Sequence, residues 1–264
     1  NNFFADAGEN STPQTSGIRV IIPQKYRASS LDIQAMRSFL WALPSEQNVM
    51  NRNLAPVLEL PMPDGRIAKF RVWESSIMAP GLAAKYPDMR TFNGQGIDDP
   101  YASIRFDLTP AGFHAQVLTV NGTFYIDPYA RGDVRQYISY FRNDIQRTGS
   151  FYCDVPENPN PRPQSVQAAC RGTQLRTYRL ALACTGEYAV AVAGPTPTIP
   201  AVAAAMLTSV NRVTGVYELE LSIRLQLVPN NNLLIYLDGN TDPYTNNNGG
   251  TMLGQNQANI DAII

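Results

Sequence analysis

Few side chains of this chain could support metal or nucleophilic chemistry. The 264 residues contain one histidine, His114, and three cysteines. A catalytic zinc site takes three protein ligands, often histidines, and a relay between histidines takes two, so this chain cannot supply either from histidine alone. His114 follows Phe113 in an expected strand, where we interpret it as a hydrogen-bonded structural residue and not as a metal ligand.

Two acidic pairs have a structural and a functional interpretation. Asp98 and Asp99 are adjacent, and adjacent side chains of an extended chain point to opposite faces, so they form a poor pair for glycoside hydrolysis. A turn after Gly96 is the preferred interpretation. Glu218 and Glu220 are expected on one face of a strand, opposite the leucines, where they would face solvent or a surface near a substrate cleft.

The segment DGNTDPYTNNNGG, residues 238–250, offers several side-chain oxygens. Asp238, Asp242, Asn246 and Asn248 are ligand types that calcium prefers, although their spacing does not follow the EF-hand loop. The same residue types form Asx turns, in which the side chain accepts a backbone N–H. A calcium loop and an Asx-turn loop therefore both remain open.

Composition excludes some function classes. Charged residues are only 16% of the chain, with 21 basic and 22 acidic residues and a formal net charge of −1. A near-neutral chain does not predict a broad phosphate-binding surface, so we expect no nucleic-acid partner. No run approaches the roughly 20 apolar residues that span a bilayer, so no membrane span is expected. Three cysteines are too few for a disulfide scaffold.

The first part of the chain is predicted to be mostly β. Residues 1–16 are polar and predict a flexible leader, and Pro63-Asp64-Gly65 predicts a hairpin turn. Ser30 is a candidate N-cap of a short helix with Leu31, Ala35 and Phe39 on one stripe. Strands are expected at residues 18–22, 55–63, 66–74, 103–109, 112–120, 123–127 and 134–141.

The pattern changes after a proline-rich segment. Residues 149–172 read as an exposed linker, because DVPENPNPRPQ places four prolines within eight positions. Beyond it, alternation predicts strands at 178–184 and 219–227, and Thr198 opens a helix that should end near Gly215. A loop and a helical segment follow. The fold class is therefore α+β: a mostly β domain followed by an incomplete α/β unit.

Long stretches of the second part resemble a known family. RTYRLALACTGEYA (176–189), residues 209–236 and TDPYTNNNGGTMLGQNQANID (241–261) are similar to the opening of the catalytic domain of bacterial reprolysin-like zinc metallopeptidases, secreted relatives of the adamalysins in the metzincin clan. Residues 70–115 and YIDPYARGD (125–133) resemble the propeptide that precedes that domain. The resemblance implies a propeptide domain at 17–148 and a truncated metallopeptidase domain at 173–264.

The resemblance also implies a function for the complete protein. The family uses HExxHxxGxxH to bind catalytic zinc and cleave protein or peptide substrates. This motif is absent here, so no catalytic residue or zinc ligand is assigned and the chain alone should be inactive. The expectation is a latent, secreted zinc endopeptidase precursor, in which the propeptide inhibits and helps to fold a catalytic domain whose remainder is its partner.

Two processing features are implied in the same way. Cys153 ends the propeptide-like part and is the candidate latency thiol, which would occupy the open zinc position. A free cysteine without a role, or a disulfide between Cys153 and Cys170, remains open, and Cys184 is expected to be buried. Arg171-Gly172 is the candidate maturation cleavage; the alternative is an ordinary linker bond.

Two other function classes remain open. The chain could be a non-enzymatic secreted β-rich binding or inhibitory module. Exposed aromatic residues at Tyr137, Tyr140 and Phe141 could bind glycans, although alternating aromatic residues in strands more often fill a core.

Overall fold

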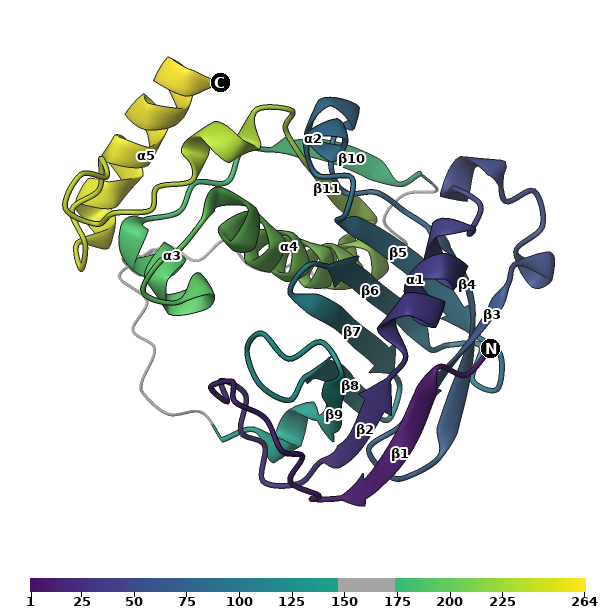
Figure 1. Ribbon diagram of the computed structural model, residues 1–264. Coiled ribbons are helices and arrows are strands. Elements are labelled where there is room, and N and C mark those ends of the chain that lie inside the picture. The colour runs from purple at the N-terminus through teal and green to yellow at the C-terminus, as the bar shows by residue number, and fades with distance from the viewer. Residues whose placement is uncertain (147–173) are drawn as a thin grey trace, which may run out of the picture.

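The computed structural model describes residues 1–146 and 174–264, which form two parts in contact (Figure 1). Residues 1–146 form a curved nine-stranded antiparallel sheet, which we call the half-barrel. Residues 174–264 form a two-stranded parallel sheet with three α-helices. The fold is α+β, as the sequence predicts.

The half-barrel sheet has the strand order β1-β2-β9-β8-β7-β6-β5-β4-β3. Its two edges approach each other: Asn2, which precedes β1, forms an isolated bridge with Glu59 of β3. Helix α1 packs Met36 and Leu40 into the core that the curved sheet encloses. The strands are β1 (Phe4–Glu9), β2 (Arg27–Leu31), β3 (Val57–Pro61), β4 (Ile67–Glu74), β5 (Arg90–Gly96), β6 (Ser103–Thr109), β7 (Gly112–Thr119), β8 (Gly122–Pro128) and β9 (Gln136–Phe141). The helices are α1 (Ile33–Trp41) and α2 (Pro80–Lys85), with 3₁₀ turns at Glu46–Asn48, Arg52–Leu54 and Arg142–Asp144.

Side-chain alternation separates two faces of this sheet. On β6, Ile104, Phe106 and Leu108 belong to the enclosed core, with Phe106 stacked on Phe92 at a centroid distance of 5.0 Å. Arg105 and Asp107 therefore point to the outer face, yet both are almost fully buried. Another element must cover the outer face of β6.

The second part supplies that covering element. The strands β10 (Arg176–Leu180) and β11 (Ile223–Leu227) pair in parallel, and α4 (Ile199–Leu221) lies between them in the chain. Thr198 caps α4 by accepting the Ala201 N–H at 3.4 Å. The remaining elements are α3 (Gly186–Ala193), a 3₁₀ turn at Asn231–Leu234, and α5 (Gly249–Ile263).

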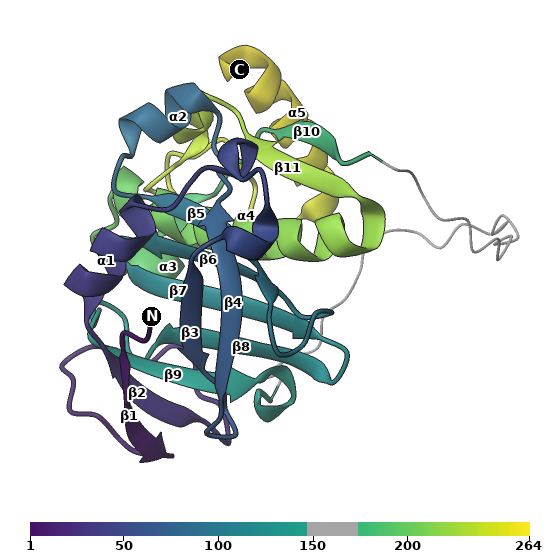
Figure 2. The ribbon, with the colours of Figure 1, turned by 90° about the vertical axis from the view of Figure 1, so that its right-hand side faces the viewer.

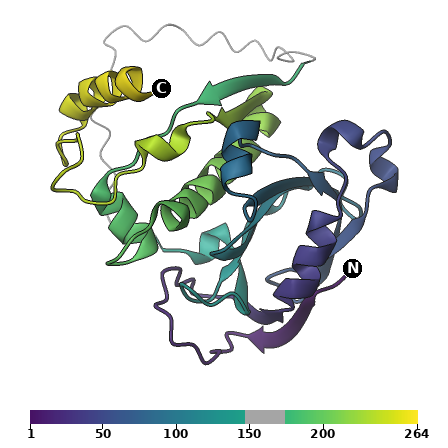
Figure 3. The same cartoon turned by 45° about the horizontal axis from the view of Figure 1, so that its top comes forward.

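Helix α4 joins the two parts, since it contacts both β6 of the half-barrel and β11 (Figures 2 and 3). The half-barrel also extends the small sheet. Leu227 on β11 donates its N–H to Ile77 at 2.8 Å, and Ala79 donates to Leu227 at 2.9 Å. Ile77 and Leu207 belong to one apolar cluster beneath this contact. The two parts thus share backbone pairing and a core.

Several sequence predictions are confirmed. The expected strands at 55–63, 66–74, 103–109, 112–120, 123–127 and 134–141 correspond to β3, β4, β6, β7, β8 and β9. Gly65 has a φ of 87°, as the predicted hairpin turn requires. Strand β5 and helices α2 and α3 were not predicted.

The sequence predictions for residues 1–16 and for residues 18–22 were wrong. Phe4–Glu9, expected to be flexible, is strand β1: Phe4 is buried in the core, and Asp6 pairs with Arg27 on β2. Residues 18–22, expected to be a strand, form none, because β2 occupies the place beside β9. Asp32, not Ser30, caps α1 by accepting the Ala35 N–H at 3.0 Å.

The strand predicted at 219–227 is correct only for its second half; residues 219–221 are helical. Helix α4 continues past Gly215 to Leu221, and Ser222 ends it in the left-handed conformation, with φ 55° and ψ 40°. Only Ile223–Leu227 is extended. Likewise, the strand expected at 178–184 ends at Leu180.

Helix α4 is long and apolar enough to cross a bilayer by length and composition, but half of the qualifying stretch is buried inside the protein. Arg212 and Glu218 on this helix form ion pairs with the half-barrel. In this fold α4 is the central helix between the two parts.

Candidate functional site

A row of polar side chains crosses the outer face of the half-barrel. Trp73, Asn93, Arg105 and Gln116 are direct partners across β4, β5, β6 and β7. Trp73, Arg105 and Gln116 are buried even though they lie outside the enclosed core. The C-terminal half of α4 accounts for this burial, because Gly215 of α4 comes against Arg105 and Gln116.

Helix α4 presents hydrogen-bonding side chains to this face. The Thr208 hydroxyl donates to Asp107 Oδ1 at 2.9 Å, and Asn211 Nδ2 donates to the Phe106 carbonyl at 2.9 Å. Arg212 Nη2 donates to Asp127 Oδ1 at 2.6 Å. Asn211 and Arg212 follow Thr208 by three and four positions, so all three lie on one side of the helix. The contact is polar and buried, in contrast to an ordinary helix–sheet contact.

Gly215 lets α4 approach the sheet. A Cβ at this position would lie 2.8 Å from Arg105 Cγ, which is closer than real Cβ atoms come to their neighbours. Glycine in a helix interior costs about 1 kcal/mol relative to alanine. Here the missing side chain makes room for the Arg105 side chain.

One turn further along α4, Glu218 accepts hydrogen bonds from two arginines. Arg105 comes from β6 and Arg224 from β11. Arg224 also donates to Glu46 of the half-barrel at 2.7 and 3.1 Å, and Ser75 donates to Glu46 at 2.9 Å. We call Glu46, Arg105, Glu218 and Arg224 the charge cluster. Both parts of the chain contribute two of its members.

Burial and ion pairing act in opposite directions on the pKa values of the charge cluster. Burial alone would raise the pKa of the Glu46 carboxyl, but the Arg224 guanidinium outweighs this effect and holds the pKa below its ordinary value. Burial lowers the pKa of Arg105 in spite of Glu218. Charges buried in this way stabilise a fold only while every partner is in place.

The single histidine has a structural role. His114 Nδ1 lies 3.1 Å from Asp107 Oδ1, and the same carboxylate oxygen accepts from Thr208. The prediction of a hydrogen-bonded strand histidine is confirmed. The predicted turn at Asp98 and Asp99 is also confirmed, since Asp99 Oδ1 accepts the Tyr101 N–H at 3.0 Å.

The aromatic residues of β9 do not form a glycan surface. Tyr137 and Tyr140 are almost completely buried, and the Tyr140 hydroxyl donates to Asp127 Oδ2 at 2.6 Å. Burial raises the pKa of both tyrosines. The core interpretation is confirmed for these two residues, and the glycan interpretation is wrong.

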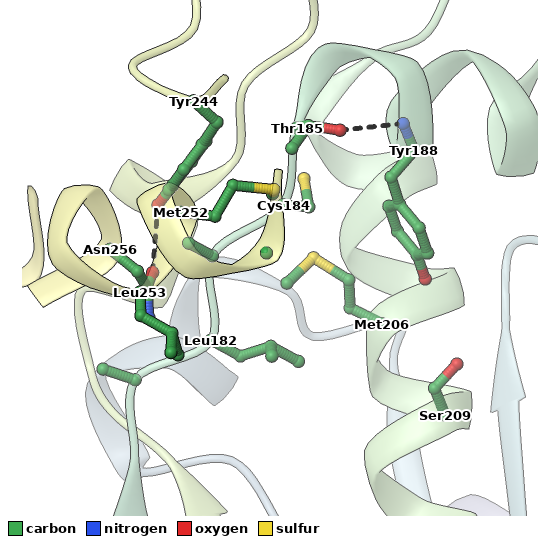
Figure 4. A pocket seen from close by; sticks show the side chains of 13 residues that line it. Leu182, Cys184, Thr185, Tyr188, Met206, Ser209, Tyr244, Met252, Leu253 and Asn256 are labelled. Carbon is green, nitrogen blue, oxygen red and sulfur yellow. Dashed lines mark hydrogen bonds between the residues drawn. The ribbon is translucent and has the colours of Figure 1, made fainter. Parts of the chain in front are cut away.

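A separate apolar pocket lies in the second part (Figure 4), and it shares no lining residue with the charge cluster. Its volume is about 630 Å³, and Leu182, Cys184, Met206 and Met252 are among its lining side chains. Cys184 is buried, as predicted; its thiol is free, and burial raises the pKa of this thiol. A thiol of this kind is a poor metal ligand and nucleophile at neutral pH.

The family of the second part follows from comparison with known proteins. Residues 174–264 match the reprolysin-like metallo-peptidase family M12B. This match covers β10 to α5, the part of the chain in which the sequence resemblance places the start of a catalytic domain. We call these residues the reprolysin-like region. No curated protein matches the chain significantly.

The zinc ligands of that family were not expected in this chain, because its sequence lacks the HExxHxxGxxH motif. Within residues 1–146 and 174–264, no group of three or more His, Cys, Asp or Glu side chains is placed to hold a metal ion. The described residues therefore do not fit the family's catalytic zinc.

The loop at 238–250 uses its oxygens in turns and caps. Asp238 Oδ1 accepts the Asn240 N–H at 2.9 Å, Asp242 Oδ2 accepts the Gly186 N–H at 2.8 Å, and Asn248 Oδ1 accepts the Thr251 N–H at 3.0 Å. Bonding to its own backbone N–H, and more weakly to Asn246, holds the pKa of Glu187 below its ordinary value. Asp238 forms an Asx turn, Asn248 caps α5, and Asp242 binds the backbone at the start of α3; the calcium site remains a prediction.

The two processing features lie outside the described residues. Cys153, the alternative partner Cys170, and the Arg171-Gly172 bond all fall within residues 147–173. The latency thiol and the maturation cleavage therefore remain predictions.

Sequence reasoning missed the most highly organised polar site of the described chain. Glu218, expected to face solvent or a surface near a substrate cleft, is half-buried in the charge cluster, whereas Glu220 is exposed. The available signal was the recurrence of polar or small residues along the apolar helix at Thr208, Asn211 and Gly215, ending at Glu218. That spacing is helical and predicts a second buried stripe.

Proposed function

We propose that this chain is part of the latent precursor of a secreted zinc-dependent endopeptidase. In this proposal the half-barrel is the propeptide, and it acts as folding aid and inhibitor of the catalytic domain that begins with the reprolysin-like region. The family match of residues 174–264 supports the enzyme class, and the buried polar contact between α4 and the half-barrel supports the folding-aid role.

The role as a folding aid follows from the partners of α4. Asn211 Nδ2, Arg212 Nη2 and the Glu218 carboxylate each form a hydrogen bond with a half-barrel residue. A buried polar group that loses its partner costs about 1–3 kcal/mol, and more when it is charged. Helix α4 is consequently less stable without the half-barrel, whose nine-stranded sheet holds its partners in register.

The remainder of the catalytic domain is the expected partner of the reprolysin-like region. Among the described residues, no strand pairs with the edge of β10 that faces away from β11. The apolar pocket beside Cys184 and Met252 offers a second surface. We propose that the remaining catalytic domain covers both and brings the zinc ligands with it.

The proposal also gives roles to the linker residues. Cys153 is the candidate thiol that blocks the zinc, and cleavage near Arg171-Gly172 would release the protease. If Cys153→Ser in a precursor with the complete zinc motif leaves latency unchanged, the thiol role is excluded.

The decisive experiment compares two proteins: the 264-residue chain and a precursor extended along its gene through the HExxHxxGxxH motif. We expect stoichiometric zinc and, after maturation, casein digestion only for the extended precursor. If the reading frame stops at Ile264, the competing non-enzymatic binding module is correct. Tightly bound zinc and robust casein digestion by the 264-residue chain would also overturn the proposal.

A further inference from the structure

Asp127 is a buried carboxylate on the outer face of the half-barrel. Phe124 and Ile126 on the same strand, β8, belong to the enclosed core, so alternation directs Asp127 outwards. Its side chain is nevertheless only 1% exposed. A carboxylate buried in this way destabilises a fold unless hydrogen-bond donors and a cation compensate its charge.

Both parts of the chain compensate this charge. Within the half-barrel, the Tyr140 hydroxyl donates to Asp127 Oδ2 at 2.6 Å. From α4, Arg212 Nη2 donates to Asp127 Oδ1 at 2.6 Å. The Tyr140 hydroxyl is a neutral donor, so Arg212 supplies the counter-charge.

The half-barrel holds the Arg212 guanidinium with an aromatic ring as well. The guanidinium carbon lies over the Tyr125 ring, 5.0 Å from the centroid. Tyr125 and Tyr140 are direct partners across β8 and β9, and their ring centroids lie 5.6 Å apart. We call Tyr125, Asp127 and Tyr140 the arginine receptor. A planar guanidinium group that donates to a carboxylate and stacks on a ring fits it, whereas the ammonium group of lysine cannot stack.

Asp127 and Arg212 have no substitute for one another. Within residues 1–146 and 174–264, neither forms an ion pair with any other residue. The charge cluster differs in this respect, because Glu218 also pairs with Arg224 of its own part. Asp127 therefore obtains its counter-charge from the other part of the chain.

We propose that the half-barrel recognises its cognate catalytic domain through the arginine receptor and selects a helix with arginine at the position of Arg212. This selection rests on the proposed role of the half-barrel as the folding aid of that domain. A helix with a neutral residue at this position leaves the Asp127 charge buried without a cation. Interfaces gain specificity from such a penalty against the wrong partner.

A double-mutant cycle in the full chain separates this selection from ordinary packing. The four proteins are the unmodified chain, Arg212→Met, Asp127→Asn and the double variant. Methionine keeps an unbranched apolar stem, and asparagine keeps the size of aspartate and an acceptor for the Tyr140 hydroxyl. Urea unfolding gives the folding equilibrium constant of each protein.

We expect Arg212→Met to lower the folding equilibrium constant at least about tenfold more in the unmodified chain than in the Asp127→Asn background, a coupling of about 1.4 kcal/mol or more. The double variant should also be more stable than Arg212→Met, because it contains no unpaired buried charge. The matched control is the exposed pair of Lys25 and Glu9, 3.2 Å apart, for which Lys25→Met and Glu9→Gln should couple by less than about fivefold.

Independent effects of the two substitutions, or a double variant less stable than Arg212→Met, would overturn the proposal. If Arg212→Met does not fold, a folded double variant supports the proposal and an unfolded one overturns it.

The pH profile gives a second readout that a packing role would not change. In Arg212→Met the folded chain should hold a proton on Asp127 that the unfolded chain releases, so its stability should fall as pH rises from about 4 to about 7. The double variant should lack this fall. Asp107 and His114, which pair 3.1 Å apart on β6 and β7, are present in both proteins, so their titration cancels in the comparison.

Parallel pH profiles of Arg212→Met and the double variant would contradict the assignment. These measurements involve neither zinc nor casein digestion, so the recognition rule and the proposed protease function can fail separately.

Discussion

Replacing Glu218 by glutamine tests the charge cluster most sharply. The substitution keeps the size and one acceptor oxygen of the side chain and removes its charge. Arg105, only 3% exposed at its side chain, then loses its carboxylate partner, whereas Arg224 retains Glu46. The variant therefore leaves one buried guanidinium without an ion pair.

The structure allows the expected effect to be bounded. Removing one partner of a buried ion pair costs about 3–5 kcal/mol. The Glu218 side chain is 14% exposed and the amide oxygen still accepts one hydrogen bond, so we expect a loss nearer to about 2–3 kcal/mol. Glu220, two residues further along the same helix, is exposed. Its replacement by glutamine should change the free energy of unfolding by less than about 0.5 kcal/mol.

Urea unfolding followed by circular dichroism measures both variants. With a slope of about 2.5 kcal/mol per M, Glu218→Gln should lower the unfolding midpoint by about 1 M and Glu220→Gln by less than about 0.2 M. The sequence pattern alone places both glutamates on one solvated strand face. Equal, small shifts for the two variants would therefore support that pattern and refute the buried charge cluster.

Three further substitutions test the local arguments. Gly215→Ala should destabilise the chain, because its Cβ would clash with Arg105, whereas Gly254→Ala on α5, which has nothing within 4 Å, should be neutral or stabilising; thermal melts separate the two. The lowered pKa of Glu46 stabilises the fold above about pH 4.3, its ordinary value, and this contribution is lost as pH falls through the lowered pKa. Glu46→Gln should therefore flatten the decline of the urea midpoint between about pH 5 and pH 3, and an unchanged pH profile would exclude this role. Asp32→Ala should cost about 1 kcal/mol by removing the cap of α1, and a loss as large for Ser30→Ala would contradict the observed cap.

The half-barrel strands could be predicted because each carries its own local signal. On β6 and β7, core residues alternate with polar ones, and Thr109 to Gly112 turns between them. Strand β1 has no such signal, since one buried residue, Phe4, and pairing with Arg27 determine it. That pairing joins distant parts of the chain, and a local pattern does not contain it.

The end of α4 was misread for a related reason. Leu219 and Leu221 continue the alternation of Ile223–Leu227, so a period of two fits all of them. The helix nevertheless continues, because Glu218 must reach Arg105 from the helix face that also carries Gly215. Contacts with the half-barrel decide the structure here, and they outweigh local propensity. The charge cluster could not be predicted without knowing that the outer sheet face is covered.

The central claim is that the half-barrel holds the reprolysin-like region in its folded state. The most direct test places a specific protease site within residues 149–172, cuts the folded chain there, and follows hydrogen exchange of the α4 amides. We predict that the two pieces co-elute after cleavage with α4 still protected, and that the reprolysin-like region loses this protection once the half-barrel is removed. Pieces that separate without denaturant, or an isolated reprolysin-like region with α4 fully protected, would contradict the claim.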